Sequence, residues 1–383
     1  MKKISIILFF ILLSVHCSPK KNTIYLGAAG PLTGDQAKMG NDILNGVSLA
    51  VEEWNTRGGV LGKKIEIIQG DDRHDPKEAV IVANRLVNKG AVGVIGHFNS
   101  SCTIPASRVY HDHKVPMITP AATNPKVTLQ GFNNIFRVCG TDDQQGKVEA
   151  EFVVSVLKKK SVAILHDKTT YGQGLADYFR DNLKGRAEMV AYEAITQGDK
   201  DFTPVLTKVR EKKPEVVMFG GIYTEGGLLA KQMKQLGMNA IFISGDGVID
   251  QEFIHIGGVS TEGAFLSFGP LGPSGEMASP MTAVTDFIRS YRARFGDVGP
   301  YSIYSYDAAN IILNAISVSS STDGEILSKS IQSMTHEGAL GRIRFSPNGD
   351  VLEAPYIMWI VKGGKFIPYG REAGRVPVAN QQR

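Results

Sequence analysis

Short apolar segments alternate with amphipathic ones along the first 140 residues, and this alternation constrains the fold more than any other feature. The amphipathic segment before Gly58 carries Ile43, Val47 and Trp54 at helical spacing, which gives one apolar stripe. Strands are expected at 23–27, 64–69, 92–95, 115–119 and 135–138. Alternation of this kind with short connections predicts a parallel, doubly wound sheet with helices on both faces.

The same alternation starts again after residue 160. Strands are expected at 161–166, 189–194, 215–220 and 240–244, with helices at 171–183, 202–212 and 225–236 between them. A chain of 383 residues is long enough for two such units. The fold class is therefore expected to be α/β, with two doubly wound Rossmann-like lobes.

The last third of the chain is less regular. A connector rich in Gly, Pro and Ser is expected at 269–280, helices at 281–295 and 302–317, and strands at 343–345 and 356–361.

The N-terminus is typical of an export signal. Lys2 and Lys3 precede an apolar run that ends at Leu13 and is too short to span a bilayer. Cys17 follows, with a polar stretch after it, as in a bacterial lipoprotein signal whose Cys carries the lipid. His16 stands where a small residue is usual, so an ordinary signal with an unrelated Cys is the alternative.

The charge balance limits the kinds of partner that the chain could bind, and the cysteine content allows at most one disulfide in the exported chain. The formal charge is +4, and removal of Lys2 and Lys3 leaves 40 basic against 38 acidic residues. That balance does not favour nucleic acid or an anionic membrane surface as a partner. Cys102 and Cys139 remain in the exported chain and either form one disulfide or stay free.

Sequence signatures of catalysis are missing. The chain has no Gly-x-Ser-x-Gly elbow, no phosphate-binding Gly-Lys-Ser/Thr loop and no His-Glu-x-x-His. The turn from Gly27 to Gly34 lacks dinucleotide spacing, and the histidines do not stand at metal-ligand spacing. We expect no enzyme activity, no cofactor and no metal.

Small polar residues follow several expected strands, where open α/β sheets bind ligands. Asn99, Ser100 and Thr123 follow strands of the first unit, and hydroxyls at helix starts suit a carboxylate. In the second unit His166-Asp167 leads to Tyr171, and Tyr223 and Asp246 also follow strands, where an acid could hold an ammonium group. Helix capping and packing are the alternatives for each residue alone.

These stretches resemble the branched-chain amino acid-binding proteins of ABC transporters, which have the type I periplasmic-binding fold. The resemblance covers about residues 24–360. The matching text is Asp71-Asp72, Asp75-Pro76-Lys77, Val94-Ile95-Gly96-His97, Pro105-Ala106-Ser107, Met117-Ile118-Thr119-Pro120-Ala121-Ala122-Thr123, His166-Asp167-Lys168 and Tyr171-Gly172-Gln173-Gly174-Leu175-Ala176.

The resemblance implies a domain plan. It implies a ligand cleft between the lobes and a three-strand hinge, crossed near Thr141, Phe268 and Ser346. The expected parts are a leader and tether at 1–22, one lobe from 23–141 plus 269–345, the other from 142–268 plus 346–370, and a tail at 371–383.

The resemblance also implies residue roles. Ser100, Thr123 and the backbone of Ala121 would hold the ligand carboxylate, Tyr171 would close from the second lobe, and Asp246 would anchor the ammonium group. The side-chain pocket would be lined by Met39, Phe98 and Tyr301. This chain departs from the family at several of these positions. Asp246 stands where the family commonly has Glu, and Ile222 stands where some relatives have a tyrosine, although Tyr223 is next to it. Asn99 and His74 stand where some relatives have a cysteine pair. These departures leave the identity of the ligand open.

The function implied is that of an extracytoplasmic solute-binding protein in the periplasm or at the cell surface, anchored through Cys17. It would close on a small amino acid, Leu, Ile or Val by default, and deliver it to an ABC permease as a monomer. The alternatives are a sensor or receptor module of the same fold, responding to amides, urea or another amino acid, and an exported α/β enzyme.

Overall fold

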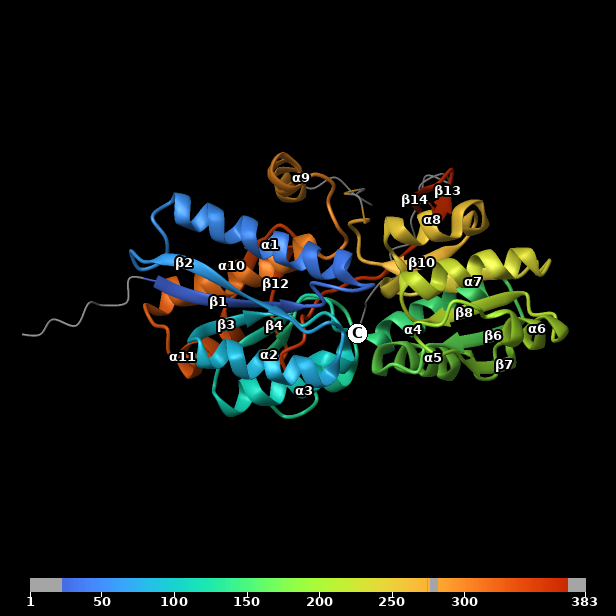
Figure 1. Cartoon of the computed structure of the whole chain (residues 1–383), viewed down its shortest axis with the longest axis horizontal. Helices are drawn as coiled ribbons and strands as arrows, with labels where there is room; N and C mark the ends of the chain where they lie inside the picture. Colours follow the sequence, from blue (N-terminus) through green and yellow to red (C-terminus); the bar gives the residue numbers. More distant parts are fainter. Residues whose placement is uncertain (1–22, 274, 276–281, 371–383) are drawn as a thin grey trace, which may run out of the picture.

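Two lobes lie side by side, each around its own sheet (Figure 1). The computed structural model describes residues 23–273, 275 and 282–370. The expected leader with Cys17 and the expected tail at 371–383 lie outside the described residues.

The first lobe contains a parallel sheet of order β2-β1-β3-β4-β5. Its strands are β1 (Thr23–Gly30), β2 (Lys64–Asp71), β3 (Ala91–Ile95), β4 (Met117–Thr119) and β5 (Ile135–Arg137). Its helices are α1 (Ala37–Thr56), α2 (Pro76–Asn88), α3 (Ser100–Asp112), α9 (Thr282–Phe295), α10 (Ser302–Ser319) and α11 (Gly324–Ser333), followed by the hairpin β11 (His336–Gly338) and β12 (Gly341–Ile343). The expected doubly wound sheet is present.

The two faces of this sheet have separate apolar cores. One core joins α1 to α10, and the other joins α2 to α3. A Cβ added at Gly93 in β3 would come within 2.8 Å of Ile312, so α10 lies directly on the strand. Trp54 of α1 donates from Nε1 to Asn310 of α10 at 2.9 Å. The helix that covers this face therefore comes from a segment over 200 residues later in the chain.

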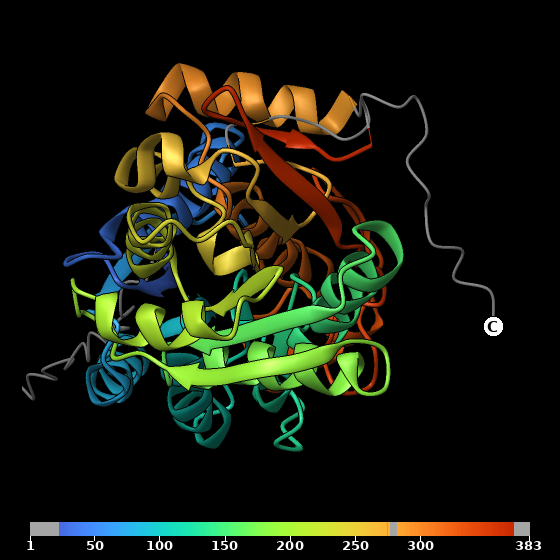
Figure 2. The ribbon, with the colours of Figure 1, turned by 90° about the vertical axis from the view of Figure 1, so that its right-hand side faces the viewer.

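The second lobe contains a sheet of order β14-β13-β10-β9-β8-β6-β7. Its parallel strands are β6 (Ser161–His166), β7 (Glu188–Ala194), β8 (Val216–Gly220), β9 (Ile241–Ser244) and β10 (Phe265–Phe268), and its antiparallel edge is β13 (Ile357–Lys362) with β14 (Lys365–Pro368). Its helices are α4 (Asp142–Glu151), α5 (Thr170–Leu183), α6 (Thr203–Glu211), α7 (Tyr223–Gln235) and α8 (Gln251–Gly257). Figure 2 faces this lobe and shows the C-terminal strands in red along its edge.

Helix α4 was not expected, because its buried face is polar. Asp142, Gln145 and Glu149 recur at helical spacing and are buried against the second sheet. The helix continues as a π-helix at residues 152–156. A search for apolar stripes passes over such a helix.

The chain passes between the lobes three times: after β5, after β10 and before β13. Asp350 and Val351 bridge to Arg137 and Phe345 of the first lobe. The third passage therefore lies between Val351 and Ile357, later than the boundary expected at 345/346. The passage lies later because the backbone of Asp350 and Val351 still pairs with the first lobe, and the sequence does not reveal this pairing.

Both described cysteines are free and buried. Cys102 belongs to the core between α2 and α3, and Cys139 belongs to the other core. The structure thus decides the question that the sequence left open in favour of two thiols.

Candidate functional site

A pocket of about 380 Å³, part of it open to solvent, lies between the lobes. Its walls come from segments that follow strands of both sheets, as the strand-end argument predicted. Eight of the ten expected residues line it: Phe98, Asn99, Ser100, Ala121, Thr123, Tyr171, Asp246 and Tyr301.

The first lobe presents uncharged hydroxyls at the start of α3 and after β4. Ser100 Oγ accepts a hydrogen bond from the backbone N–H of Asn124 at 3.2 Å, so its own proton remains available for a ligand. Thr123 Oγ1 is buried and makes no hydrogen bond of full geometry within the described residues, although it lies close enough to the Asp142 carboxyl to lower the pKa of that group. Two hydroxyls beside a helix N-terminus can donate to a carboxylate without a formal positive charge.

A buried hydrogen-bond chain lies beneath this wall. His97 contacts Asp72 through Nδ1 at 2.7 Å and Tyr110 through Nε2 at 3.0 Å. Thr119 donates from Oγ1 to the carbonyl of His97 at 2.8 Å. These bonds tie the segment after β3 to β4 and so hold Phe98, Asn99 and Ser100 in place.

The second lobe presents Asp246, which follows β9. Its Oδ1 accepts from the Tyr171 hydroxyl at 2.9 Å, and its Oδ2 lies 3.1 Å from the Tyr301 hydroxyl of the first lobe. Burial raises the pKa of Asp246 to about 6, and the two tyrosine hydroxyls partly offset this rise. At neutral pH Asp246 is therefore mainly ionised, and a ligand ammonium group would supply the missing counter-charge.

Two further acids on α4 lie behind Asp246. Burial raises the pKa of Glu149 to about 8 and that of Asp142 well above its ordinary value. Glu149 accepts from Ser267 Oγ at 2.6 Å, and the Thr123 hydroxyl lies close enough to the Asp142 carboxyl to offset part of the rise in its pKa. Glu149 is therefore mainly protonated at neutral pH, and burial disfavours the ionised form of Asp142, so Asp246 carries most of the negative charge at this end of the pocket.

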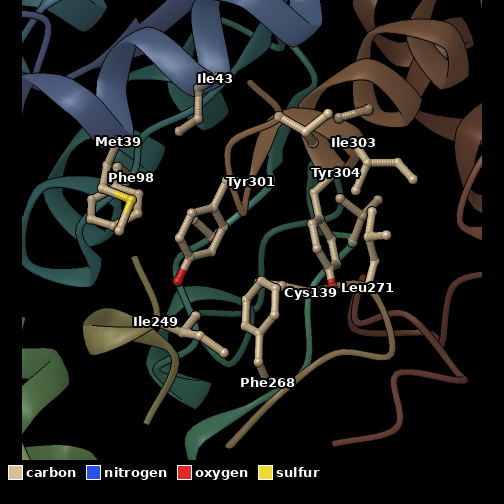
Figure 3. Close-up of a cluster of buried hydrophobic side chains, with 14 of the residues drawn as sticks. Met39, Ile43, Phe98, Cys139, Ile249, Phe268, Leu271, Tyr301, Ile303 and Tyr304 are labelled. Carbon is tan, nitrogen blue, oxygen red and sulfur yellow. The ribbon is translucent and has the colours of Figure 1, made fainter. Parts of the chain in front are cut away.

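Aromatic side chains form the apolar part of the site. Phe98 and Tyr301 meet edge to face with ring centroids 5.1 Å apart, and Phe268 meets Tyr301 at 5.7 Å (Figure 3). Met39 is fully buried in the same apolar cluster as Phe98 (Figure 3), so it supports the pocket wall and does not itself line the pocket.

Tyr223 also lies outside the pocket lining and instead joins the lobes. Its hydroxyl donates to the carbonyl of Asp35 at 2.7 Å. Asn124 donates from Nδ2 to the carbonyl of Thr170 at 2.9 Å, and Lys38 lies 3.7 Å from Asp250. With these contacts the lobes are closed on each other around the pocket.

Seven lining residues were not among the expected ligand contacts: His74, Ser101, Asp167, Thr169, Gln197, Ile222 and Gly247. Asp167, Gln197 and Ile222 follow β6, β7 and β8 directly or within three residues. The strand-end rule that found Ser100 and Asp246 would have included them.

Neither a metal site nor a membrane-spanning helix is found in the described part of the chain. No group of three or more His, Cys, Asp and Glu side chains there could hold a metal ion. None of its helices combines the length and the apolar character needed to cross a bilayer.

Comparison with known proteins places this geometry in context. The family model described as "Periplasmic binding protein" matches residues 23–365. The chain is 39% identical to the "Amino acid binding protein" of Pseudomonas aeruginosa, covering 89% of this chain and 91% of the relative. It is 38% identical to the "Leu/Ile/Val-binding protein homolog 1" of Brucella abortus, covering 88% and 90%.

Solved structures of similar binding proteins have the same fold as this chain. The leucine binding protein LivK of Thermotoga maritima superposes with a TM-score of 0.84 at 29% identity, covering 90% of this chain and 97% of that one. The branched-chain amino acid transporter substrate binding protein LivJ of Streptococcus pneumoniae, solved with isoleucine, gives 0.83 at 26%, again covering 90% and 97%.

Proposed function

Because the chain belongs to the periplasmic binding protein family, we propose that it is the solute-binding component of an ABC importer, closing on a free amino acid and delivering it to a membrane permease. The printed names of its relatives put leucine, isoleucine and valine first among the ligands to test. The family is one of solute-binding proteins, and the proposed role includes no chemistry on the ligand.

One observation carries the proposal: the two walls complement the two ends of a zwitterion. Ser100 and Thr123 offer hydroxyl donors for a carboxylate on the first lobe. Asp246 offers a buried carboxylate for an ammonium group on the second lobe. Charge-assisted hydrogen bonds of both kinds are stronger than neutral ones.

Such a ligand would also drive closure. Only a ligand that binds the closed form better than the open form can shift the equilibrium between them. A zwitterion that touches Ser100 and Asp246 has this preference, because it gains the second contact only when the lobes meet. The permease would then recognise the closed form.

Further details belong to the same proposal. The family works outside the cytoplasm. We propose that this chain is held there, in the periplasm or at the cell surface, by a lipid on Cys17, and that it acts as a monomer.

The test is calorimetric titration of the purified, ligand-depleted protein with the L-amino acids. Binding of at least one amino acid, strongly weakened by Asp246→Ala and by Thr123→Ala, is the expected result. A ligand at 1,000 times its Kd should also stabilise the fold by about 4 kcal/mol in a thermal-shift assay. Absence of binding by every amino acid, or binding that neither substitution affects, would reject the proposal.

A further inference from the structure

The pocket extends beyond Asp246 along the edge of the second sheet. Strands β9, β8, β6 and β7 are neighbours in that order, and Asp246, Ile222, Asp167 and Gln197 follow them in turn. Neighbouring strands lie about 4.8 Å apart, so Asp167 follows a strand about 10 Å from that of Asp246. If Asp246 takes the ammonium group, the ligand side chain meets the part of the wall nearer Asp167.

Asp167 reaches this part of the pocket with one oxygen unused. Its Oδ1 accepts from the N–H and the hydroxyl of Thr169, at 2.9 and 2.7 Å, which fixes the carboxyl group at the start of α5. Its Oδ2 is buried and receives no hydrogen bond from any residue that the structure describes. The residue is only 3% exposed.

The first lobe offers a second unused acceptor in the same pocket. Asn99 donates from Nδ2 to Gln36 Oε1 at 2.8 Å, and Gln36 Nε2 lies 2.7 Å from His74 Nδ1. Burial lowers the pKa of His74, which favours the neutral ring, and in the tautomer with its proton on Nε2 the Nδ1 atom accepts from Gln36. This chain of bonds orients both amides and leaves Asn99 Oδ1 without a donor in the described ranges, on a residue 9% exposed.

A purely aliphatic side chain would leave both acceptors unsatisfied, which is costly for buried polar groups. We propose that the cleft selects amino acids whose side chain ends in nitrogen donors, a carboxamide or an ammonium group, which Asn99 Oδ1 and Asp167 Oδ2 accept from opposite lobes. This inference rests on the proposed function, because the same α-amino and α-carboxylate contacts must hold the ligand first.

The nearby residues fit this assignment. Thr169 and Gln197 add polar groups to the same part of the wall, and Ile222 and Phe98 cover the stem of a longer side chain. A site built around hydrogen-bond acceptors rejects an analogue without donors far more strongly than an apolar pocket rejects a missing methyl group.

The first experiment compares ligands of matched shape by calorimetry on the ligand-depleted protein. Asparagine and leucine branch alike, and glutamine, lysine and glutamate extend further. We expect the best nitrogen-donor amino acid to bind about tenfold or more tightly than leucine, and glutamate, an acceptor only, to bind weakest. Leucine, isoleucine or valine binding more tightly than asparagine, glutamine and lysine would overturn the inference and leave the proposed function intact.

The second experiment changes the two acceptors. Asp167→Asn keeps an oxygen for Thr169 but replaces the free acceptor with a donor, so the nitrogen-donor ligand should lose about tenfold in affinity while leucine changes little. A larger loss for lysine than for glutamine assigns an ammonium group, and the reverse assigns a carboxamide. Asn99→Leu removes the acceptor of the first lobe, so it should shift the preference toward leucine even though Asp167 is unchanged.

The matched control is Asp323→Asn, the same change at the first-lobe helix α11, which Asp323 caps. It should leave every affinity unchanged. Equal losses for leucine and for the nitrogen-donor ligand in Asp167→Asn would show a structural effect and overturn the inference. Failure of all amino acids to bind would overturn both this inference and the proposed function.

Discussion

The two walls of the cleft differ in whether their buried charges are paired within the protein. Behind the first wall Arg137 is fully buried, and its guanidinium donates to Asp350, to the carbonyls of Ala122 and Asn124, and to Thr128. The positive charge of Arg137 is thus neutralised internally, and uncharged polar groups such as Ser100, Thr123 and Asn99 face the ligand. The second wall instead presents Asp246 and Asp167, for which no ion pair is found within the described ranges.

This difference assigns distinct tasks to the lobes. A wall whose charges are already paired can bind a carboxylate through dipoles without a large change on closure. A wall with an uncompensated buried carboxylate gains most when a cation arrives, because unpaired buried charge is costly. The ammonium contact should therefore contribute more to closure than the carboxylate contact.

The largest expected effect comes from removing charge on the second wall. Asp246→Asn keeps the size of the side chain and should weaken amino acid binding about a hundredfold or more, as loss of a buried charged partner does. Calorimetric titration measures the change. Glu149→Gln is the matched control, because Glu149 is largely protonated at pH 7 and should tolerate the change; equal losses in both variants would contradict the assignment.

A smaller loss is expected on the first wall. Ser100→Ala removes one charge-assisted hydrogen bond but leaves Thr123 and the N-terminus of α3 in place, so affinity should fall about tenfold. The same titration provides the comparison. A loss exceeding that of Asp246→Asn would reverse the order of the two walls.

Acid should weaken binding through the second wall, where burial raises the pKa of Asp246 and that of Asp167 to about 6. The folded-state pKa of Asp246, about 6, is above its ordinary 3.8, so in the free protein this group favours folding at low pH and loses that contribution as pH rises through 6. Ligand affinity moves the other way, because protonation removes the ammonium partner. Leucine should bind about tenfold more weakly at pH 5 than at pH 7; titrations that show no change between these values would contradict the role of Asp246.

The smallest effect concerns neither wall. Tyr223→Phe removes the bond to Asp35 that joins the lobes beside the pocket, and affinity should fall about threefold, as for one neutral hydrogen bond. Tyr192→Phe is the control, because the Tyr192 hydroxyl bonds to Asp177 within the second lobe. If both variants bind alike in calorimetry, the cross-lobe bond does not favour closure.

Local patterns predicted much of this architecture. Strand and helix periods identified both sheets, and the position after a strand identified Ser100, Thr123 and Asp246. Met39 and Tyr223 were expected to line the pocket but do not, because near the starts of α1 and α7 the Met39 side chain packs behind the wall and the Tyr223 hydroxyl reaches across to the first lobe. Position along the chain does not distinguish these outcomes.

Pairing between strands that are far apart in the sequence could not be predicted from such local patterns. The edge strands β13 and β14 join the second sheet through residues 357–368, far from the other strands in sequence. Helix α4 escaped notice because Asp142, Gln145 and Glu149 occupy its inner face. The free acceptors of Asn99 and Asp167 depend on which neighbour each amide or carboxyl meets, which only the folded structure reveals.

The return of the chain to the first lobe has a consequence for the order of assembly. All five strands of that lobe's parallel sheet are complete at Arg137, yet the face of β3 that contacts Ile312 remains uncovered until α10 is made. Contacts of such large sequence separation form slowly. A chain emerging N-terminus first therefore leaves this apolar face uncovered while its second lobe is still being made, and the unfinished chain is prone to aggregate through it.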